Sequence, residues 1–298
     1  MSANRSLEHL SFGERLNFLL TNRIPRRWLT LLIGRFSKIE DPLVQSLSIG
    51  IWRLFADDLR LEEAEKTRFD SMHDCFTRTL KAGARPIDLR DDVLTSPCDA
   101  VVGAFGQVAD GQVIQAKGFP YSIADLFGDT GTADAFHDGC FVTLRLKSSM
   151  YHRFHAPADG RIGRIRYISG DTWNVNPVAL KVVERLFCKN ERVVLPLTTS
   201  RGERITMVAV AAILVASVRL HGLESPLNLR YGGPTLIDLD REYAKGEEIG
   251  YFEHGSTIVV FAPPGLRFDE SVVEGSIIRM GQPLLRTQDR SDTSSTRD

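Results

Sequence analysis

Apolar residues in the first 60 positions recur every three or four residues, which is the spacing of one helix face. Pro25 suits a first helical turn, where its missing N–H costs nothing, and Asp41 followed by Pro42 is a typical helix start. Two apolar stripes result: Trp28, Leu32 and Phe36, then Leu43, Leu47, Ile51 and Leu54. Such stripes either pack against the rest of the protein or lie on a membrane surface.

Beyond residue 90 the pattern changes to short β-rich runs separated by Gly, Pro and Asp turns. Residues 140–146 alternate apolar and polar positions, which predicts a half-buried strand. Further strands are expected at 192–197, at 204–220 as two strands, and at 257–262. The predicted fold class is α+β, with a mainly antiparallel β core and a helical, membrane-facing N-terminal region.

Composition supports a globular chain with local charge asymmetry. Its 298 residues are 43% hydrophobic, enough for a sizeable core, and the net charge of −1 gives no sign of nucleic-acid binding. Residues 1–40 nevertheless hold seven Arg and Lys against three Glu, interleaved with apolar residues. That mixture suits an anionic membrane surface.

The four cysteines are far apart and show no C-x-x-C motif or zinc spacing, so reduced thiols in a cytoplasmic protein are expected. The longest apolar run, 207–218, is about half the ~20 residues that a spanning helix needs. No bilayer-crossing segment is predicted.

Two stretches carry candidate chemistry. In MYHRFHAP (150–157), His152 and His155 precede Ala-Pro in an extended or turning segment, which disfavours a metal site and leaves structural roles open. In HGST (254–257), Ser256 belongs either to a simple turn or to a nucleophilic site, since serine needs a base within hydrogen-bond reach. His155 could be that base, and Asp99 could orient it. Walker loops, dinucleotide motifs and G-x-S-x-G elbows are absent.

Eight blocks in a fixed order carry a more specific signal. They are FTRTLKAGARPID (76–88), SPCDAVVG (96–103), QAKGFPYSIADLFG (115–128), YHRFHAP (151–157), GDTWNVNP (170–177), LFCKNERV (186–193), GEEIGYFEHGSTIVVFAP (246–263) and GQPL (281–284). In these blocks the chain resembles the bacterial phosphatidylserine decarboxylases across nearly its whole length. The commonest form of the family has leucine where this chain has His254.

The resemblance implies self-cleavage at the Gly255–Ser256 bond by serinolysis. Asp99, His155 and Ser256 match the family's maturation triad, and Ser256 becomes a covalent pyruvoyl group, the only cofactor, with no metal required. This group would form a Schiff base with phosphatidylserine and yield phosphatidylethanolamine and CO2. His152 is the expected proton donor and positions the substrate carboxylate.

The sequence pattern and the resemblance together predict how the chain is divided and what it associates with. Residues 1–60 would be a helical membrane-associating region, 61–286 a β-rich catalytic domain, and 287–298 a disordered tail. A β chain ending at Gly255 and an α chain starting at Ser256 would stay together, with a homodimer favoured, at the cytoplasmic face of the cell membrane. Two alternatives remain: a serine hydrolase that uses the same triad without self-cleavage, and a catalytically silent lipid-binding protein.

Overall fold

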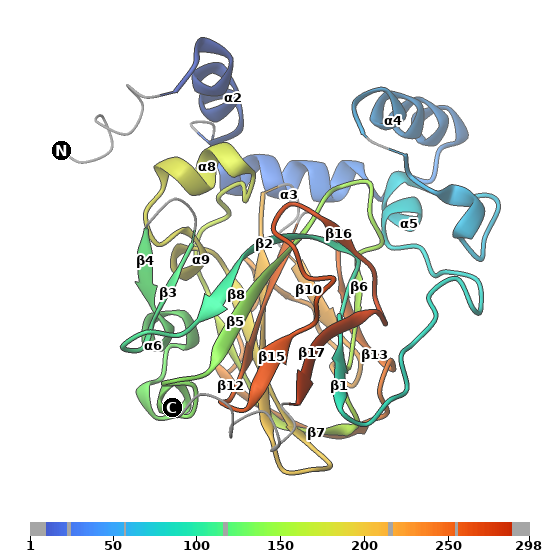
Figure 1. The fold of residues 1–298 in the computed structure, drawn as a ribbon. Coiled ribbons are helices and arrows are strands. Elements are labelled where there is room, and N and C mark those ends of the chain that lie inside the picture. Colours follow the sequence, from blue (N-terminus) through green and yellow to red (C-terminus); the bar gives the residue numbers. More distant parts are fainter. Residues whose placement is uncertain are drawn as a thin grey trace, which may run out of the picture.

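An eight-stranded antiparallel sheet forms the centre of the protein (Figure 1). The structure is a computed structural model that describes residues 10–22, 25–56, 58–115, 119–213, 217–253 and 256–287. The strands of this sheet are, in spatial order, β12 (Leu236–Tyr243), β7 (Gly160–Ile168), β8 (Arg192–Thr199), β9 (Arg204–Ala211), β14 (Ser256–Ala262), β5 (Cys140–Leu146), β2 (Ala100–Gln107) and β16 (Ile277–Ile278). Strand β14 therefore lies near the middle of the sheet, between β9 and β5.

Three smaller sheets complete the β structure. A four-stranded sheet has the order β11 (Leu227–Asn228), β10 (Ser217–Leu220), β13 (Glu248–Phe252) and β6 (Arg153–His155). A three-stranded sheet has the order β1 (Val93–Thr95), β17 (Pro283–Thr287) and β15 (Leu266–Phe268), and β3 (Gln112–Ile114) pairs with β4 (Pro120–Ser122). All named strand pairs are antiparallel.

Both faces of the central sheet are buried. One face packs against the four- and three-stranded sheets, in a cluster that includes Val260 and Phe252. The other face, with Phe261 at its centre, packs against short helices. These helices are α6 (Ile123–Phe127), α7 (Thr130–Asp134), α8 (Pro177–Val182) and α9 (Leu186–Lys189). The prediction that residues 140–146 are only half-buried is therefore wrong: Thr143, on the expected polar face, is 2% exposed because the helical layer covers it.

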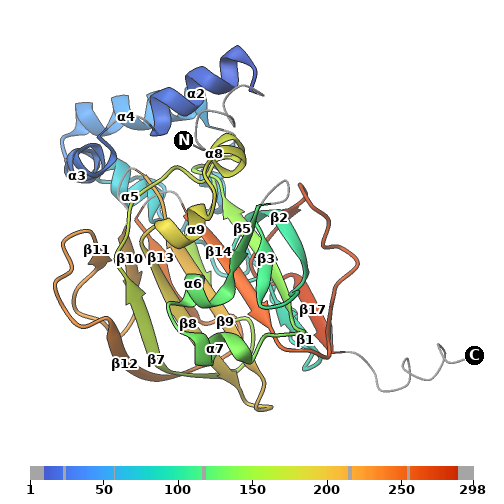
Figure 2. The same cartoon turned by 90° about the vertical axis from the view of Figure 1, so that its left-hand side faces the viewer.

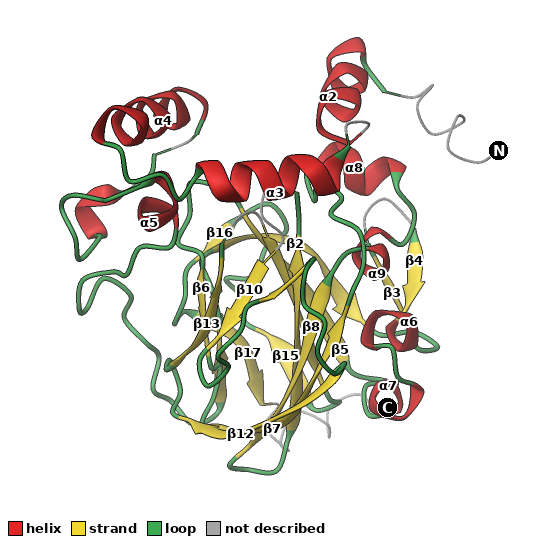
Figure 3. Cartoon of the chain, turned by 180° about the vertical axis from the view of Figure 1, so that it is seen from behind, coloured by secondary structure: helices red, strands yellow, loops and turns green. Residues whose placement is uncertain are grey.

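The N-terminal helices α2 (Phe12–Asn22), α3 (Arg26–Phe36) and α4 (Pro42–Phe55) lie at one end of the β core (Figures 1 and 2). Seen from behind, α3 crosses the ends of the strands (Figure 3). The predicted helix start at Asp41 is confirmed, since its side chain accepts hydrogen bonds from two N–H groups of the first turn of α4. Pro25 is the N-cap of α3, one residue before the helix begins. A 3-10 turn (Leu61–Glu63) and α5 (Met72–Phe76) lead to the β region.

The apolar stripes of α3 and α4 face away from the core. Trp28 is 79% exposed, Leu32 66%, Leu43 81% and Leu54 79%, so the interpretation that these stripes pack against the rest of the chain is wrong. None of the helices in the described ranges is long and apolar enough to cross a membrane.

Other predictions from the sequence agree with the structure. The mainly antiparallel α+β fold is confirmed, as are the strands in 140–146, 192–197 and 257–262 and the division of 204–220 into β9 and β10. All four cysteines are free. Thr287 ends β17, and the rest of the predicted tail, 288–298, lies outside the described residues.

Candidate active site

Ser256 is the first residue of β14 and is fully buried. Its backbone pairs with Leu146 of β5 on one side and Ala211 of β9 on the other. Among the described residues, its hydroxyl has no hydrogen-bond partner. An unpaired buried hydroxyl costs about 1–3 kcal/mol, and the neighbouring Thr257 hydroxyl shares this state; what distinguishes Ser256 is its place at the predicted cleavage site. Gly255, the other residue of the predicted cleavage site, and His254 before it lie outside the described residues.

His155 ends β6 and is held in one tautomer. Its Nδ1 lies 2.9 Å from the carbonyl oxygen of Gly246, which can only accept, so Nδ1 carries the proton. Its Nε2 is then the basic nitrogen and accepts a hydrogen bond of 3.0 Å from the Tyr151 hydroxyl. Burial lowers the pKa of His155, which keeps the ring neutral and able to take a proton.

Asp99 is bound mainly by an arginine that the sequence analysis did not single out. The Nε and Nη2 atoms of Arg85 donate to its carboxylate at 2.6–3.0 Å, and the Met280 N–H donates at 3.0 Å. Arg85 also donates to Glu63 at 2.8 Å. The carboxylate of Asp99 is thus held in a buried ion pair.

The segments of Asp99 and His155 are adjacent, because the His155 N–H donates to the Pro97 carbonyl at 2.8 Å. A hydrogen bond from His155 to Asp99 or to Ser256 is not among the contacts of the described residues; the Gly246 carbonyl takes the position predicted for Asp99. The charge of Asp99 is close enough to raise the pKa of His155, against the larger effect of burial. The maturation triad therefore stays a prediction.

His152 lies beside the strand that leads to the cleavage site. Its carbonyl accepts from the Phe252 N–H at 3.0 Å, and its ring packs on Phe76 with centroids 4.0 Å apart. Its Nδ1 donates to the Met150 carbonyl at 2.8 Å, which leaves Nε2 as the basic nitrogen. The predicted role of His152 stays a prediction.

Glu253 was missed by sequence reasoning, although it stands three residues before Ser256. Its side chain is 5% exposed, and its carboxylate lies 2.9 Å from Lys38 Nζ and 3.5 Å from His73 Nε2. Burial alone would raise the pKa of Glu253, but its hydrogen-bond donors and the charge of Lys38 outweigh burial and lower it. Glu253 therefore connects the end of α3 to the segment that enters β14.

Glu191 is a second buried acid near this end of the sheet. Its carbonyl accepts from the Ala211 N–H at 2.9 Å, and Ala211 is the residue opposite Ser256. Burial raises the pKa of Glu191 to about 7, and the Tyr167 hydroxyl donates to its carboxylate. No spacing in the sequence indicated that this side chain would be buried.

Fold and site together define a class of protein: an antiparallel β core with a buried serine on a central strand, a buried neutral histidine, and an exposed apolar helical face. The sequence profile of phosphatidylserine decarboxylase matches residues 72–286. The chain belongs to the phosphatidylserine decarboxylase family.

Individual relatives agree over nearly their full length. The phosphatidylserine decarboxylase proenzyme of Vibrio cholerae serotype O1 is 38% identical over 273 residues, which cover 87% of this chain and 94% of the relative. The proenzyme of Vibrio vulnificus is 37% identical over 282 residues, covering 89% and 96%. That of Chromobacterium violaceum is 35% identical over 284 residues, covering 91% and 99%.

Proposed function

We propose that this chain is a proenzyme that cuts itself between Gly255 and Ser256 and then decarboxylates phosphatidylserine to phosphatidylethanolamine. The observation that carries the proposal is the Ser256 hydroxyl, which is fully buried, has no partner among the described residues and directly follows the proposed scissile bond. The relatives' names, phosphatidylserine decarboxylase proenzyme, support both the reaction and the precursor.

Self-cleavage requires a base for Ser256, and His155 is the best candidate because its ring is neutral with a basic Nε2. The Ser256 oxygen bonds to the Gly255 carbonyl carbon, the peptide C–N bond breaks, and the nitrogen takes up a proton. Elimination of the resulting ester releases the Gly255 carboxylate, and hydrolysis with loss of ammonia leaves a ketone at position 256. Tyr151 must give up its hydrogen bond to Nε2 before the proton can move.

These reaction steps leave a pyruvoyl group at position 256, and the buried position at the start of β14 fits this group. Its ketone oxygen comes from water and replaces the backbone nitrogen of Ser256, whereas the serine hydroxyl oxygen leaves with the Gly255 carboxylate. Position 256 is fully buried, which would protect that ketone from bulk water. Once formed, the group supplies an electron sink for the electrons released as CO2 leaves. His152, whose backbone is tied to Phe252, positions the substrate carboxylate and delivers the proton that replaces it.

The N-terminal helices hold the enzyme on the cytoplasmic face of the cell membrane. Support comes from the exposed apolar side chains on α2, α3 and α4. The three helices lie at the same end of the core (Figure 2). An apolar helical face with basic neighbours binds at the interface of an anionic bilayer, where a phospholipid substrate remains.

The test is the intact mass of the denatured protein beside a Ser256→Ala control, followed by CO2 release from labelled phosphatidylserine. We expect two fragments split after Gly255, the shorter with a pyruvoyl-blocked N-terminus, and CO2 from the cut protein alone. A full-length chain in both samples would overturn self-cleavage and favour a serine hydrolase or a silent lipid binder.

A further inference from the structure

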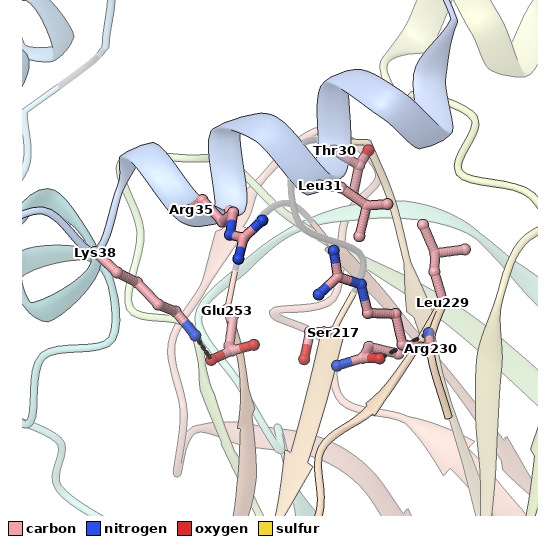
Figure 4. Close-up of a pocket in the computed structure, with 10 residues that line it drawn as sticks. Thr30, Leu31, Arg35, Lys38, Ser217, Leu229, Arg230 and Glu253 are labelled. Carbon is pink, nitrogen blue, oxygen red and sulfur yellow. Dashed lines mark hydrogen bonds and ion pairs between the residues drawn. The ribbon is translucent and has the colours of Figure 1, made fainter. Parts of the chain in front are cut away.

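A pocket of about 340 Å3 lies beneath α3, between this helix and the strand ends near β10, β11 and β13. Its α3 side includes Arg35 and Lys38, and its β side includes Ser217, Arg230 and Glu253. Figure 4 shows the guanidinium groups of Arg35 and Arg230 in the space under the helix, with Glu253 deeper in the pocket.

The pocket carries uncompensated positive charge. Its one acid, Glu253, is neutralised by Lys38 at 2.9 Å. Within the described part of the chain, no carboxylate forms an ion pair with Arg35 or with Arg230. Two guanidinium groups in one concave site, with no ion-pair partner among the described residues, suit a phosphodiester, because each can donate two parallel hydrogen bonds to its oxygens.

The pocket also lies under the helix that carries exposed apolar residues, and it includes a residue of the segment that precedes the nucleophile. Trp28 and Leu32 on α3 are exposed, and Glu253, which lines the pocket, stands three residues before Ser256 in the chain. In a phospholipid with its acyl chains in the bilayer and its headgroup amine at residue 256, the phosphate is in the middle. A phosphate held at Arg35 and Arg230 would leave the acyl chains near the exposed apolar residues of α3 and the headgroup near the segment before Ser256.

We propose that Arg35 and Arg230 bind the phosphodiester of the phosphatidylserine headgroup in this pocket. The assignment rests on the proposed function and deepens it by naming a substrate-binding subsite. It makes α3 both a membrane-docking helix and one wall of the substrate site.

Binding to the uncut Ser256→Ala chain tests the subsite without any catalysis. The probe is glycerophosphoserine, which has the phosphodiester and the headgroup but no acyl chains, measured by calorimetry with Arg35→Gln and Arg230→Gln in that background. We expect each variant to weaken binding about tenfold, the size of one lost charge-assisted hydrogen bond. The matched control is Arg204→Gln, which removes the same charge at the opposite end of β9 from Ala211 and should bind as the parent does.

Several results would overturn the subsite: no binding to the parent, equal binding by all three variants, or displacement by inorganic phosphate at equal concentration, which would indicate a free-anion site. In the cut enzyme with phosphatidylserine in uncharged detergent micelles, we expect Arg35→Gln and Arg230→Gln to raise KM about tenfold with kcat within about twofold. If the wild type releases no CO2 while the Ser256→Ala chain still binds the probe, the decarboxylase function fails and the subsite stands. If the wild type is active and the arginine variants match Arg204→Gln, only the subsite fails.

Discussion

Lys38 and Glu253 form an ion pair of 2.9 Å that connects the end of α3 to the residue three positions before Ser256. The two residues are 215 positions apart in the chain. The pair joins the exposed helical region to the segment that precedes the proposed cut, so a change on the helix can reach that segment through one contact.

Lys38→Met should loosen α3, because Glu253 is buried and its carboxylate would lose its closest cation. We expect trypsin to cut after Arg35 several-fold faster than in the parent. Lys66→Met is the matched control, since it breaks an ion pair with Asp74 in which the lysine side chain is 54% exposed. Equal trypsin rates in the two variants would show that the Lys38 pair does not hold the helix.

Tyr151→Phe should speed self-cleavage. The Tyr151 hydroxyl occupies the Nε2 lone pair of His155, and a net hydrogen bond is worth about 1 kcal/mol, or roughly fivefold in rate. The Gly246 carbonyl still fixes the tautomer in the variant. The measurement is the loss of full-length chain after a pulse of cell-free synthesis. Slower cleavage would show instead that Tyr151 assists the proton transfer.

Arg85→Met should destabilise the protein, because it removes the cation that donates hydrogen bonds to the buried Asp99 carboxylate and, among the described residues, leaves only Arg279, at 3.7 Å. We expect the free energy of unfolding to fall by about 3–5 kcal/mol, measured by denaturant titration in the Ser256→Ala background so that every sample is one uncut chain. Adding Asp99→Leu should recover part of the loss.

The control for Arg85→Met is Arg90→Met. Its ion pair with Asp88 involves an arginine side chain that is 53% exposed, and such pairs contribute about 0–1 kcal/mol. Comparable losses in Arg85→Met and Arg90→Met would contradict the assignment of Arg85 as the principal partner of Asp99.

Glu191 should make stability fall as pH rises. Its folded pKa of about 7 lies above the ordinary 4.5, so the folded state binds the extra proton between these values. Glu191 contributes about 3 kcal/mol to the free energy of unfolding. This contribution is complete below pH 4.5 and is lost as the pH rises through 7. Burial of His155 has the opposite effect on the pH dependence of stability. Because burial lowers the pKa of this ring, the free energy of unfolding falls as the pH drops below about 6.5.

Denaturant titrations of the Ser256→Ala chain from pH 4.5 to 8, with and without Glu191→Gln, separate these effects. The Glu191→Gln variant should lose the decline toward pH 7, whereas Glu242→Gln, at an exposed position, should keep it. An unchanged profile in Glu191→Gln would show that Glu191 ionises normally.

Trp28→Glu and Leu32→Glu together should reduce binding to anionic vesicles by tenfold or more, because each removes an apolar side chain whose full burial is worth about 1.5–3 kcal/mol. Self-cleavage should continue, since both residues face away from the core. Leu89→Glu is the control, because Leu89 is 74% exposed on the loop before β1. Equal vesicle binding by the double variant and the control would exclude α3 from the membrane interface.

Local patterns were enough to predict much of the fold and several site residues. Asp41 followed by Pro42 marked the start of α4, and alternation marked β5, because caps and strand periodicity depend on neighbours in the chain. Ordered motifs indicated Ser256, His155 and Asp99 as candidates. The sequence could not show that Thr143 is covered by helices, since that depends on elements distant in the chain.

The sequence by itself determined the element types, the family and the chemistry open to Ser256, because these depend on residue identity and short spacings. Only the tertiary structure decided the partners. In the folded chain Arg85 pairs with Asp99, and Lys38 pairs with Glu253. The Gly246 carbonyl and the Tyr151 hydroxyl are the hydrogen-bond partners of His155. A buried charge or ring nitrogen takes whichever complementary group the packed chain brings within about 3 Å, and that choice is made by the folding of distant segments together.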